Sequence, residues 1–265
     1  MSRLLQHDRR KLAKFPSLVG VDEAGRGCLA GPVSAAAVWL DRSFFGDPRR
    51  ARLANRANDS KKLSPAARED LHDALCRWQG EGILRMAQAT ADILEIDAYN
   101  ILGATRLAMS RCLQALSDTE TRAGHPPPFV TTATASVSNT PANGECGAAA
   151  LLFQSNHHSH PLVLVDGRPL RPFVWHHDAL VGGDGRSLCI ALASILAKVR
   201  RDHLMQEIDR QYPQYGLAIH KGYATPDHIN AIRRHGPCPQ HRPLFLRKIL
   251  APTPSPAEHQ TEFGF

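Results

Sequence analysis

The stretch LVGVDEAGRG, residues 18–27, places two acidic residues at the end of a short apolar run. Residues 18–21 are typical of a buried strand, and Asp22 and Glu23 follow it directly. Successive side chains of a strand point to opposite faces of the sheet, so both acids can face one site only if the strand breaks here. Gly25 and Gly27 can supply that break, because glycine adopts positive φ readily and lets its backbone approach a ligand closely.

Short apolar runs on both sides of this stretch predict the remaining strands. They cover residues 17–21, 32–40, 82–90, 161–167 and, more weakly, 178–185. Apolar residues at helical spacing predict helices over 64–78, 93–116 and 187–211. The order of these elements predicts an α/β fold in which helices pack on a mixed sheet.

Two segments do not fit this pattern. Residues 121–160 carry only Arg122 and Glu145 as formal charges and are rich in Pro, Thr, Ser, Ala and Asn, so we expect a largely disordered insertion. The proline-rich residues 251–265 are expected to form a disordered tail. The sequence therefore predicts one domain over residues 17–250, interrupted by the insertion.

Composition and charge narrow the classes of protein to consider. The chain of 265 residues is 43% hydrophobic, which is enough for a sizeable core. Its 32 Lys and Arg against 25 Asp and Glu give a net charge of +7, which suits a polyanionic partner but also serves solubility. No apolar run approaches the ~18 residues of a membrane span, and the polar, basic first 15 residues lack the apolar core of a secretory signal. Six scattered cysteines without a CxxC pair favour a reducing compartment, so we expect a cytoplasmic protein without membrane attachment.

The chemistry suggested by the sequence lies in its acids. Asp22, Asp166 and Asp184 each end a predicted strand, and Glu23 lies beside the first. Neighbouring strands would gather these four carboxylates, and such a cluster repels itself unless cations relieve the repulsion. Oxygen ligands that leave coordination positions open suit Mg²⁺ or Mn²⁺. Two such ions about 4 Å apart can activate water and stabilise the leaving oxygen of a phosphodiester.

Other interpretations of these residues have less support in the sequence. Turns favour polar residues, so any one acid after a strand has an ordinary explanation, although three strands that all end in Asp weaken it. The glycines at 25, 27 and 31 give GxGxxxG rather than the dinucleotide-binding GxGxxG. His235 with Cys238 to His241, and HHSH at 157–160, lack a second ligand pair at zinc-finger spacing, which argues against zinc.

Six motifs in order along the chain carry a resemblance to a known family. They are GVDEAGRGCLAGPVSAAAV (20–38), NDSKKLSPAARE (58–69), IDAYNILGATRLAM (96–109), LVDGR (164–168), GGDGRSLCIALASILAKVRRD (182–202) and YPQYGLAIHKGYATPDH (212–228). Together they resemble ribonuclease HII, the type 2 ribonuclease H, over residues 17–117 and 161–250. Six linked motifs are far more specific than any one of them.

The resemblance implies both a fold and an activity. The implied fold is that of ribonuclease H, a five-stranded mixed sheet flanked by helices, with an added C-terminal helical region. Asp22, Glu23, Asp166 and Asp184 would hold Mn²⁺ or Mg²⁺ and catalyse cleavage on the 5′ side of a ribonucleotide, leaving 5′-phosphate and 3′-hydroxyl ends. The implied substrates are RNA/DNA hybrids and duplex DNA that contains ribonucleotides, and the implied state is a monomer.

The resemblance also implies nucleic-acid contacts. The GRG turn, Gly25, Arg26 and Gly27, would grip the ribonucleotide, and Tyr223 of the HKGY motif would pack against the next sugar. The implied phosphate contacts are Ser60, Lys61, Lys62, Lys198 and Lys221, although a lysine pair before a helix is usually a solvated edge and a lysine near an apolar stripe often snorkels. Residues 228–256 contain five Lys and Arg and no acid, so we expect this stretch to line the duplex.

Four residues depart from the family pattern. Cys28 stands where proline is usual, Gly182 where lysine is usual, Leu192 where a small residue is usual and Leu244 where serine is usual. These departures leave the rate of cleavage and the substrate preference open. Two competing functions remain, a non-catalytic nucleic-acid-binding relative and a nuclease with another substrate, such as a junction resolvase. The presence of all four acids argues against the first, and the GRG turn with Tyr223 argues against the second.

Overall fold

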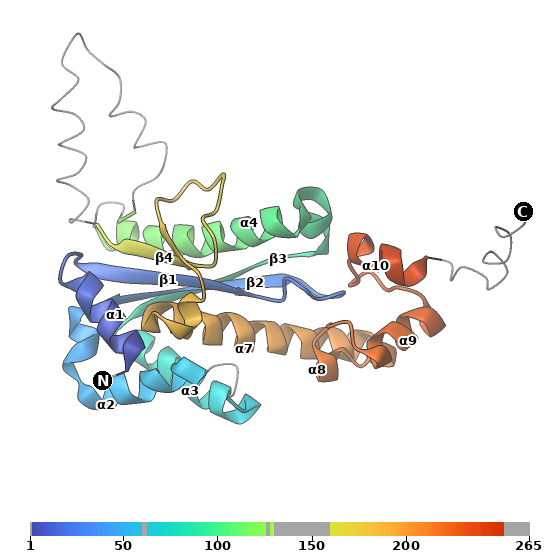
Figure 1. Ribbon diagram of the computed structural model, residues 1–265, viewed down its shortest axis with the longest axis horizontal. Coiled ribbons are helices and arrows are strands. Elements are labelled where there is room, and N and C mark those ends of the chain that lie inside the picture. Colours follow the sequence, from blue (N-terminus) through green and yellow to red (C-terminus); the bar gives the residue numbers. More distant parts are fainter. Residues whose placement is uncertain (1, 60–62, 126–127, 130–159, 252–265) are drawn as a thin grey trace, which may run out of the picture.

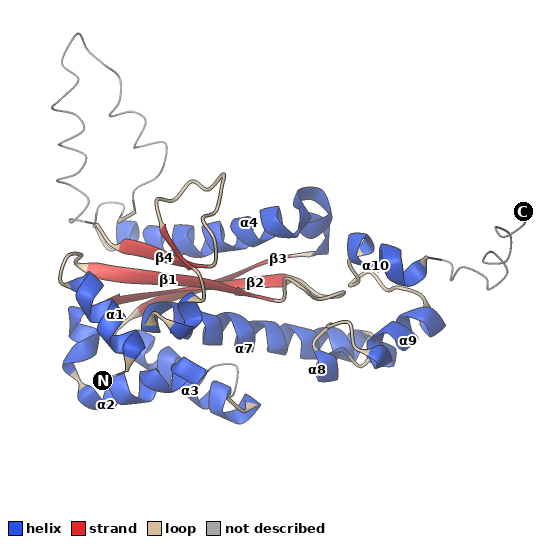
Figure 2. Ribbon diagram, in the orientation of Figure 1, coloured by secondary structure: helices blue, strands red, loops and turns tan. Residues whose placement is uncertain are grey.

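The computed structural model describes residues 2–59, 63–125, 128–129 and 160–251, and their core is a five-stranded sheet in the order β3-β2-β1-β4-β5 (Figures 1 and 2). The strands are β1 Ser17–Ala24, β2 Val33–Asp41, β3 Arg85–Ala91, β4 Leu162–Asp166 and β5 Asp178–Leu180. β1 is antiparallel to β2 and parallel to β4, and β4 is parallel to β5. The predicted mixed sheet is confirmed.

Helices cover both faces of this sheet. They are α1 Arg3–Leu12, α2 Pro48–Ala54, α3 Pro65–Gly80, α4 Ile93–Arg122, α7 Leu188–Gln211, α8 Leu217–His220, α9 Pro226–His235 and α10 Pro243–Leu250. Short 3₁₀ turns are η1 Arg42–Gly46, η2 Asn55–Asp59, η4 Gly183–Gly185 and η5 Pro213–Tyr215. α4 lies along one face and α7 along the other, while α8 to α10 form the predicted C-terminal helical region at one end (Figure 1). No helix among the described residues is long and apolar enough to cross a membrane.

Alternation along β1 divides the core into two layers. Leu18 packs in the cluster that contains the apolar residues of α7, whereas Val19 and Val21 pack in the cluster that contains Met109 and Leu113 of α4. Because β1 is buried and covered by helices on both faces, its sequence is a continuous apolar run. The same alternation directs Asp22 to the α7 face and Glu23 to the α4 face.

Two predictions about the strand ends were wrong. The strand predicted to end at Val21 continues through both acids to Ala24, because Asp22 and Glu23 pair with Ala36 and Ala35 of β2. The chain breaks at Gly25, one of the two predicted glycines, where φ is 93°. β5 ends at Leu180, and Asp184 lies beyond it in the 3₁₀ turn η4 rather than at a strand end. In both cases the neighbouring strand determines the length of the strand, and an isolated apolar run does not contain that information.

Two helices also differ from the prediction. The helix predicted to end near residue 116 continues to Arg122, with a kink at Asn100 where φ is 55°. The side chain of Asn100 accepts hydrogen bonds from the backbone of Leu102 and Gly103 and so caps the second segment. α1 was not predicted, although Ser2 caps it and Leu4, Leu5 and Leu12 anchor it in the core.

Part of the predicted insertion is ordered. Phe129 is buried, with ring centroids 5.3 Å from Trp39 and 5.8 Å from Trp175. The predicted insertion therefore begins later than residue 121, because α4 continues to Arg122, and its residue Phe129 packs in the core. Residues 130–159 and 252–265, which carry the rest of the insertion and the tail, lie outside the described residues.

Candidate functional site

The two acids of β1 lie close together at its carboxyl end. Asp22 is buried, its Oδ1 accepts a hydrogen bond from the Glu23 amide at 2.8 Å, and its side chain also bonds Ser194 of α7. Burial raises the pKa of Asp22 well above its usual value, and the charges of Glu23 and Asp166 raise it further. Burial also raises the pKa of Glu23, against the opposing effect of Arg26, whose Nη1 lies 3.0 Å from Oε1 of Glu23.

Asp166 joins these acids from the neighbouring strand. It ends β4, whose Val165 pairs with Val21, so it lies beside the end of β1. Its Oδ1 accepts a hydrogen bond of 2.6 Å from the Gly183 amide in η4. This bond ties the end of β4 to the turn that carries Asp184. Three chain segments thus bring the four predicted acids to one edge of the sheet.

The donor set fits a hard divalent cation. It consists of carboxylate oxygens, and the mutual repulsion that raises the pKa of Asp22 is what a cation would relieve. Among the described residues, however, no three His, Cys, Asp or Glu side chains converge closely enough to enclose an ion. Asp22, Glu23 and Asp166 lie within electrostatic range of one another, and their side chains would have to close on the ion.

The GRG turn follows the acids and is held from behind. Gly25 has φ of 93°, and a Cβ at this position would lie 1.8 Å from Nε of Arg201, so both conformation and space require glycine. A Cβ at Gly27 would meet nothing within 4 Å, so the outer side of the turn is open. The carbonyl oxygens of Gly25 and Arg26 accept hydrogen bonds from Arg242 at 2.8 and 2.9 Å.

Arg201 and Arg242 were missed as site residues. Both are buried, and neither forms an ion pair with a described carboxylate; each donates to backbone carbonyls instead. Arg242 also bonds Gly31, and Arg201 bonds Ala30, Pro32 and Lys221 at 2.8–3.2 Å. Burial lowers the pKa of Arg242 to about 10. The expectation that all five cations of residues 228–256 line the duplex was wrong for Arg242, because its guanidinium points into the protein.

The HKGY motif lies against the segment that follows the GRG turn. The Leu29 amide donates to the Gly222 carbonyl at 2.8 Å, and a Cβ on Gly222 would lie 2.6 Å from the Ala30 carbonyl oxygen. Tyr223 keeps 47% of its surface exposed, and its hydroxyl shares a hydrogen bond with the buried thiol of Cys28. The structure thus brings Tyr223 and the GRG turn together on one side of the acids.

The remaining predicted contacts have different surroundings. Nζ of Lys198 lies 2.7 Å from Oδ1 of Asp202, so its charge is already paired. Lys221 adopts φ of 52°, and burial lowers the pKa of its ammonium. Ser60, Lys61 and Lys62 lie outside the described residues.

Comparison with known proteins identifies the family. A family model described as Ribonuclease HII matches residues 19–122 and 171–248. The ribonuclease HII of Chloroflexus aggregans is 40% identical over 247 residues, covering 92% of this chain and 94% of that protein. The ribonuclease HII of Thermotoga maritima is 41% identical over 232 residues, covering 88% and 74%.

Solved structures share the fold. Ribonuclease H2 of Pyrococcus horikoshii superposes with a TM-score of 0.56 at 21% identity, covering 88% of this chain and 96% of that one. Bst-RNase HIII, solved in complex with Mn²⁺, superposes with a TM-score of 0.55 at 19% identity, covering 86% and 65%. The model match and the 40% identity over most of the chain show that it belongs to the ribonuclease HII family of metal-dependent endoribonucleases.

Proposed function

We propose that this endoribonuclease hydrolyses the phosphodiester on the 5′ side of a ribonucleotide, in RNA/DNA hybrids or in duplex DNA that contains ribonucleotides. The products would carry 5′-phosphate and 3′-hydroxyl ends. The observation that supports this proposal is the juxtaposition of the carboxylate edge with the braced GRG turn and Tyr223. A bare carboxylate cluster serves many phosphodiesters, whereas a rigid turn beside an exposed aromatic ring suits the recognition of one sugar within a duplex.

We propose that Asp22, Glu23, Asp166 and Asp184 hold the catalytic metal. Two Mn²⁺ or Mg²⁺ ions would supply an activated water and stabilise the leaving oxygen. The chain itself would position the substrate. The open side of Gly27 allows the backbone to approach a sugar closely, and the exposed ring of Tyr223 can pack on the next sugar. Arg26, Lys198, Lys221, Ser60, Lys61 and Lys62 would contact phosphates, with Lys198 leaving Asp202 to do so.

We also propose that the enzyme acts as a monomer in the cytoplasm. Cys28, Cys76, Cys112, Cys189 and Cys238 are free thiols in the structure, which supports a reducing compartment.

A cleavage assay tests the proposed function. The substrate is a labelled duplex with one ribonucleotide, incubated with Mg²⁺, Mn²⁺ or EDTA, and the cut is mapped at nucleotide resolution. We expect one cut 5′ to the ribonucleotide that EDTA abolishes. An all-DNA duplex and a four-way junction are the controls. Equal cleavage of the all-DNA duplex would show that the cut does not depend on a ribonucleotide, and equal cleavage of the junction would favour the junction-resolving alternative. Tight binding without cleavage under every metal would favour the non-catalytic alternative.

A further inference from the structure

The positive charge of the chain is concentrated at the end of the sheet opposite the acids. Residues 2–16 and 41–56, here called the basic lobe, contain ten Lys and Arg against three Asp. Their net charge of +7 equals that of the whole chain, because the remaining 22 Lys and Arg balance 22 Asp and Glu. The lobe comprises α1, η1, α2 and the start of η2, with the turn that leads into β1.

The few acids of the lobe do not offset this charge at the surface. Each is engaged with a backbone amide within hydrogen-bond distance. Asp8 is buried and accepts from Cys189 at the start of α7, while Asp41 and Asp47 accept from Ser43 and Arg49. By contrast, the exposed side chains of Arg10, Lys14 and Arg49 make no hydrogen bond or ion pair with described residues.

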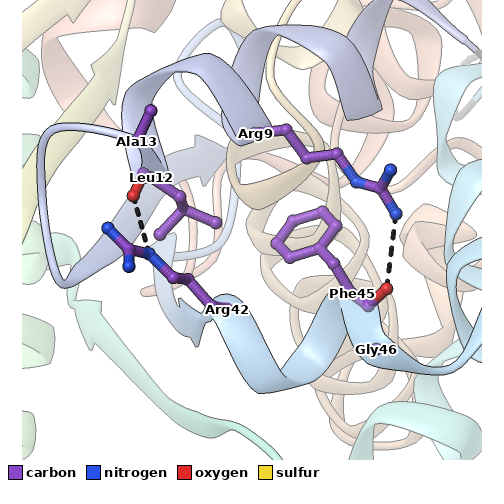
Figure 3. Close-up of a pocket in the computed structure, with 6 residues that line it drawn as sticks. All are labelled: Arg9, Leu12, Ala13, Arg42, Phe45 and Gly46. Atoms are coloured by element: carbon purple, nitrogen blue, oxygen red, sulfur yellow. Dashed lines mark hydrogen bonds between the residues drawn. The ribbon is translucent and has the colours of Figure 1, made fainter.

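The lobe surface is hollowed, and two of its arginines are held in place by backbone carbonyls. Arg9 donates to the Phe45 carbonyl at 3.3 Å and Arg42 to the Leu12 carbonyl at 2.9 Å, on opposite sides of a pocket of about 300 Å³ (Figure 3). A second hollow is lined by Arg10, Lys11 and Lys14 together with His7, Phe15 and Asp178, whose carboxylate lies 3.4 Å from Nζ of Lys11. The Arg42 guanidinium is fixed through Nε, so its two Nη groups remain as donors for a ligand, and this arrangement suits phosphate oxygens.

The four acids and the basic lobe are close enough for one duplex to contact both. β1 connects them, with Ser17 at the lobe and Asp22 at the acids, a span of about 17 Å at 3.3–3.4 Å per residue. Lys14 is three residues further, at most about 10 Å more. At 3.4 Å per base pair, a duplex bound at the acids needs about 8 more base pairs to reach Lys14.

We propose that the basic lobe is a second binding site for duplex phosphates, which holds the substrate at a distance from the cut. The inference rests on the proposed function for the identity of the polyanion. The lobe does not suit a membrane, because interfacial binding needs exposed apolar side chains. No large apolar side chain of the lobe is exposed among the described residues.

The test compares two charge-matched triple variants. The lobe variant is Arg10→Gln with Lys14→Gln and Arg49→Gln, and the control variant is Arg77→Gln with Arg122→Gln and Arg210→Gln, exposed cations on α3, α4 and α7. Binding of all-DNA duplexes of about 10 and about 30 base pairs is measured against salt concentration. We expect the lobe variant to bind the long duplex about 10-fold more weakly, with a salt slope reduced by about 3. The short duplex cannot fill the site at the acids and also extend about 8 further base pairs to the lobe, so it should distinguish the two variants less than the long duplex does.

Three results would overturn the proposal. The first is that the lobe variant binds the long duplex as tightly as the wild type does. The second is that the control variant loses as much affinity for the long duplex as the lobe variant, which assigns the effect to net charge. The third is that the lobe variant loses binding only to vesicles of 30% phosphatidylserine in phosphatidylcholine. Unchanged melting temperatures exclude misfolding. Failure of the wild type to cut the ribonucleotide duplex, together with lobe-dependent binding of long DNA, would refute the proposed function and support the lobe.

Discussion

Asp22 illustrates, at the scale of a residue, how a carboxylate suited to metal binding weakens the fold that holds it. Burial of its side chain raises its pKa, and the charges of Glu23 and Asp166 raise it further, so the ionised form is held at a cost in stability. The backbone bond from Glu23 and the contact with Ser194 offset part of that cost. A neutral isostere would keep these bonds and remove the repulsion.

We therefore expect Asp22→Asn to abolish cleavage and to raise the melting temperature in EDTA. Each kcal/mol of relieved repulsion corresponds to about 2–4 °C for a chain of this size. Thermal unfolding in EDTA and single-turnover cleavage with Mn²⁺ measure the two effects. Asp178→Asn, which affects an exposed acid paired with Lys11, is the control. Wild-type cleavage by both Asp22→Asn and Asp184→Asn would contradict the assignment of the acids.

Tyr223 allows a test of the proposed recognition of the sugar. If its ring packs on a sugar beside the ribonucleotide, Tyr223→Ala should slow cleavage at a lone ribonucleotide by 10-fold or more, about 1.4 kcal/mol. Tyr223→Phe keeps the ring and loses only the bond to Cys28, so it should retain most of the activity. Binding to all-DNA duplex, which depends on phosphate contacts, should change little in either variant. Equal loss of cleavage and of all-DNA binding in the alanine variant would refute a role in reading the sugar.

At the scale of elements, the GRG turn depends on side chains far away in sequence. Arg242, at the cap of α10, makes hydrogen bonds of 2.8–2.9 Å to the carbonyls of Gly25, Arg26 and Gly31. We expect Arg242→Leu to lower the free energy of unfolding by about 2–4 kcal/mol, because buried carbonyls lose their donors. Urea denaturation measures this loss, and Arg247→Leu, on the exposed side of α10, is the control. Equal stability of the two variants would show that water replaces the guanidinium.

The turn that carries Tyr223 is held by histidines. The Cys238 amide donates to Nδ1 of His241, so Nε2 of His241 carries the proton that bonds Nε2 of His228 at 3.1 Å. Nδ1 of His228 then donates to the Tyr223 carbonyl at 2.9 Å. This chain is complete only when both histidines are neutral. Burial, the largest effect, lowers the pKa of His228 to about 4 and also lowers the pKa of His241.

Protonation of His228 is therefore disfavoured in the folded state, whereas in the unfolded state the ring can take up a proton freely. The stability from the neutral ring is complete above pH 6.5 and should fall as the pH drops from 6.5 towards 4. Urea midpoints between pH 7 and 5 measure this decline. Because Asp22 and Glu23 shift stability in the opposite direction, His228→Asn is the reference, and its midpoint should fall less steeply. Parallel slopes for the variant and the wild type would exclude the histidine pair as the cause.

These elements show what sequence reasoning can and cannot predict. Apolar runs and their polar ends located β1 and β4, because this signal is local, and linked motifs predicted the acids and Tyr223 as site residues. The strand end predicted at Val21 was wrong because pairing with β2 extends β1 to Ala24. Arg201 and Arg242 were missed because a buried arginine looks like any surface cation in a sequence, and its burial depends on the carbonyls that the fold collects around it.

At the scale of the whole molecule, the chain joins distant segments into one body. α1, which the sequence reasoning did not predict, is tied to the start of α7 by Asp8, which bonds the Cys189 amide at 2.8 Å. Its apolar positions are few and lie in a basic context, so the helical pattern is weak until the core that receives Leu4 and Leu12 is known. The strand order β3-β2-β1-β4-β5 likewise depends on the pairing of β1 with β4, which joins residues more than a hundred positions apart.

The predicted insertion contains one residue that packs in the core and a long stretch of weakly apolar composition. Phe129 packs against Trp39 and Trp175, whereas the composition of residues 131–158 offers little apolar surface to offset the entropy of ordering. Replacing 131–158 by a short Gly/Ser linker should leave the melting temperature and the cleavage of a single-ribonucleotide duplex nearly unchanged, since closure entropy varies by only about 0.6 kcal/mol per doubling of loop length. Phe129→Ala should instead cost about 3–5 kcal/mol, because it leaves a cavity between two tryptophans. A drop of many degrees in the melting temperature on deletion would show that AAALLF at 148–153 docks on the body. A loss of cleavage at unchanged melting temperature would show that HHSH at 157–160 reaches the substrate.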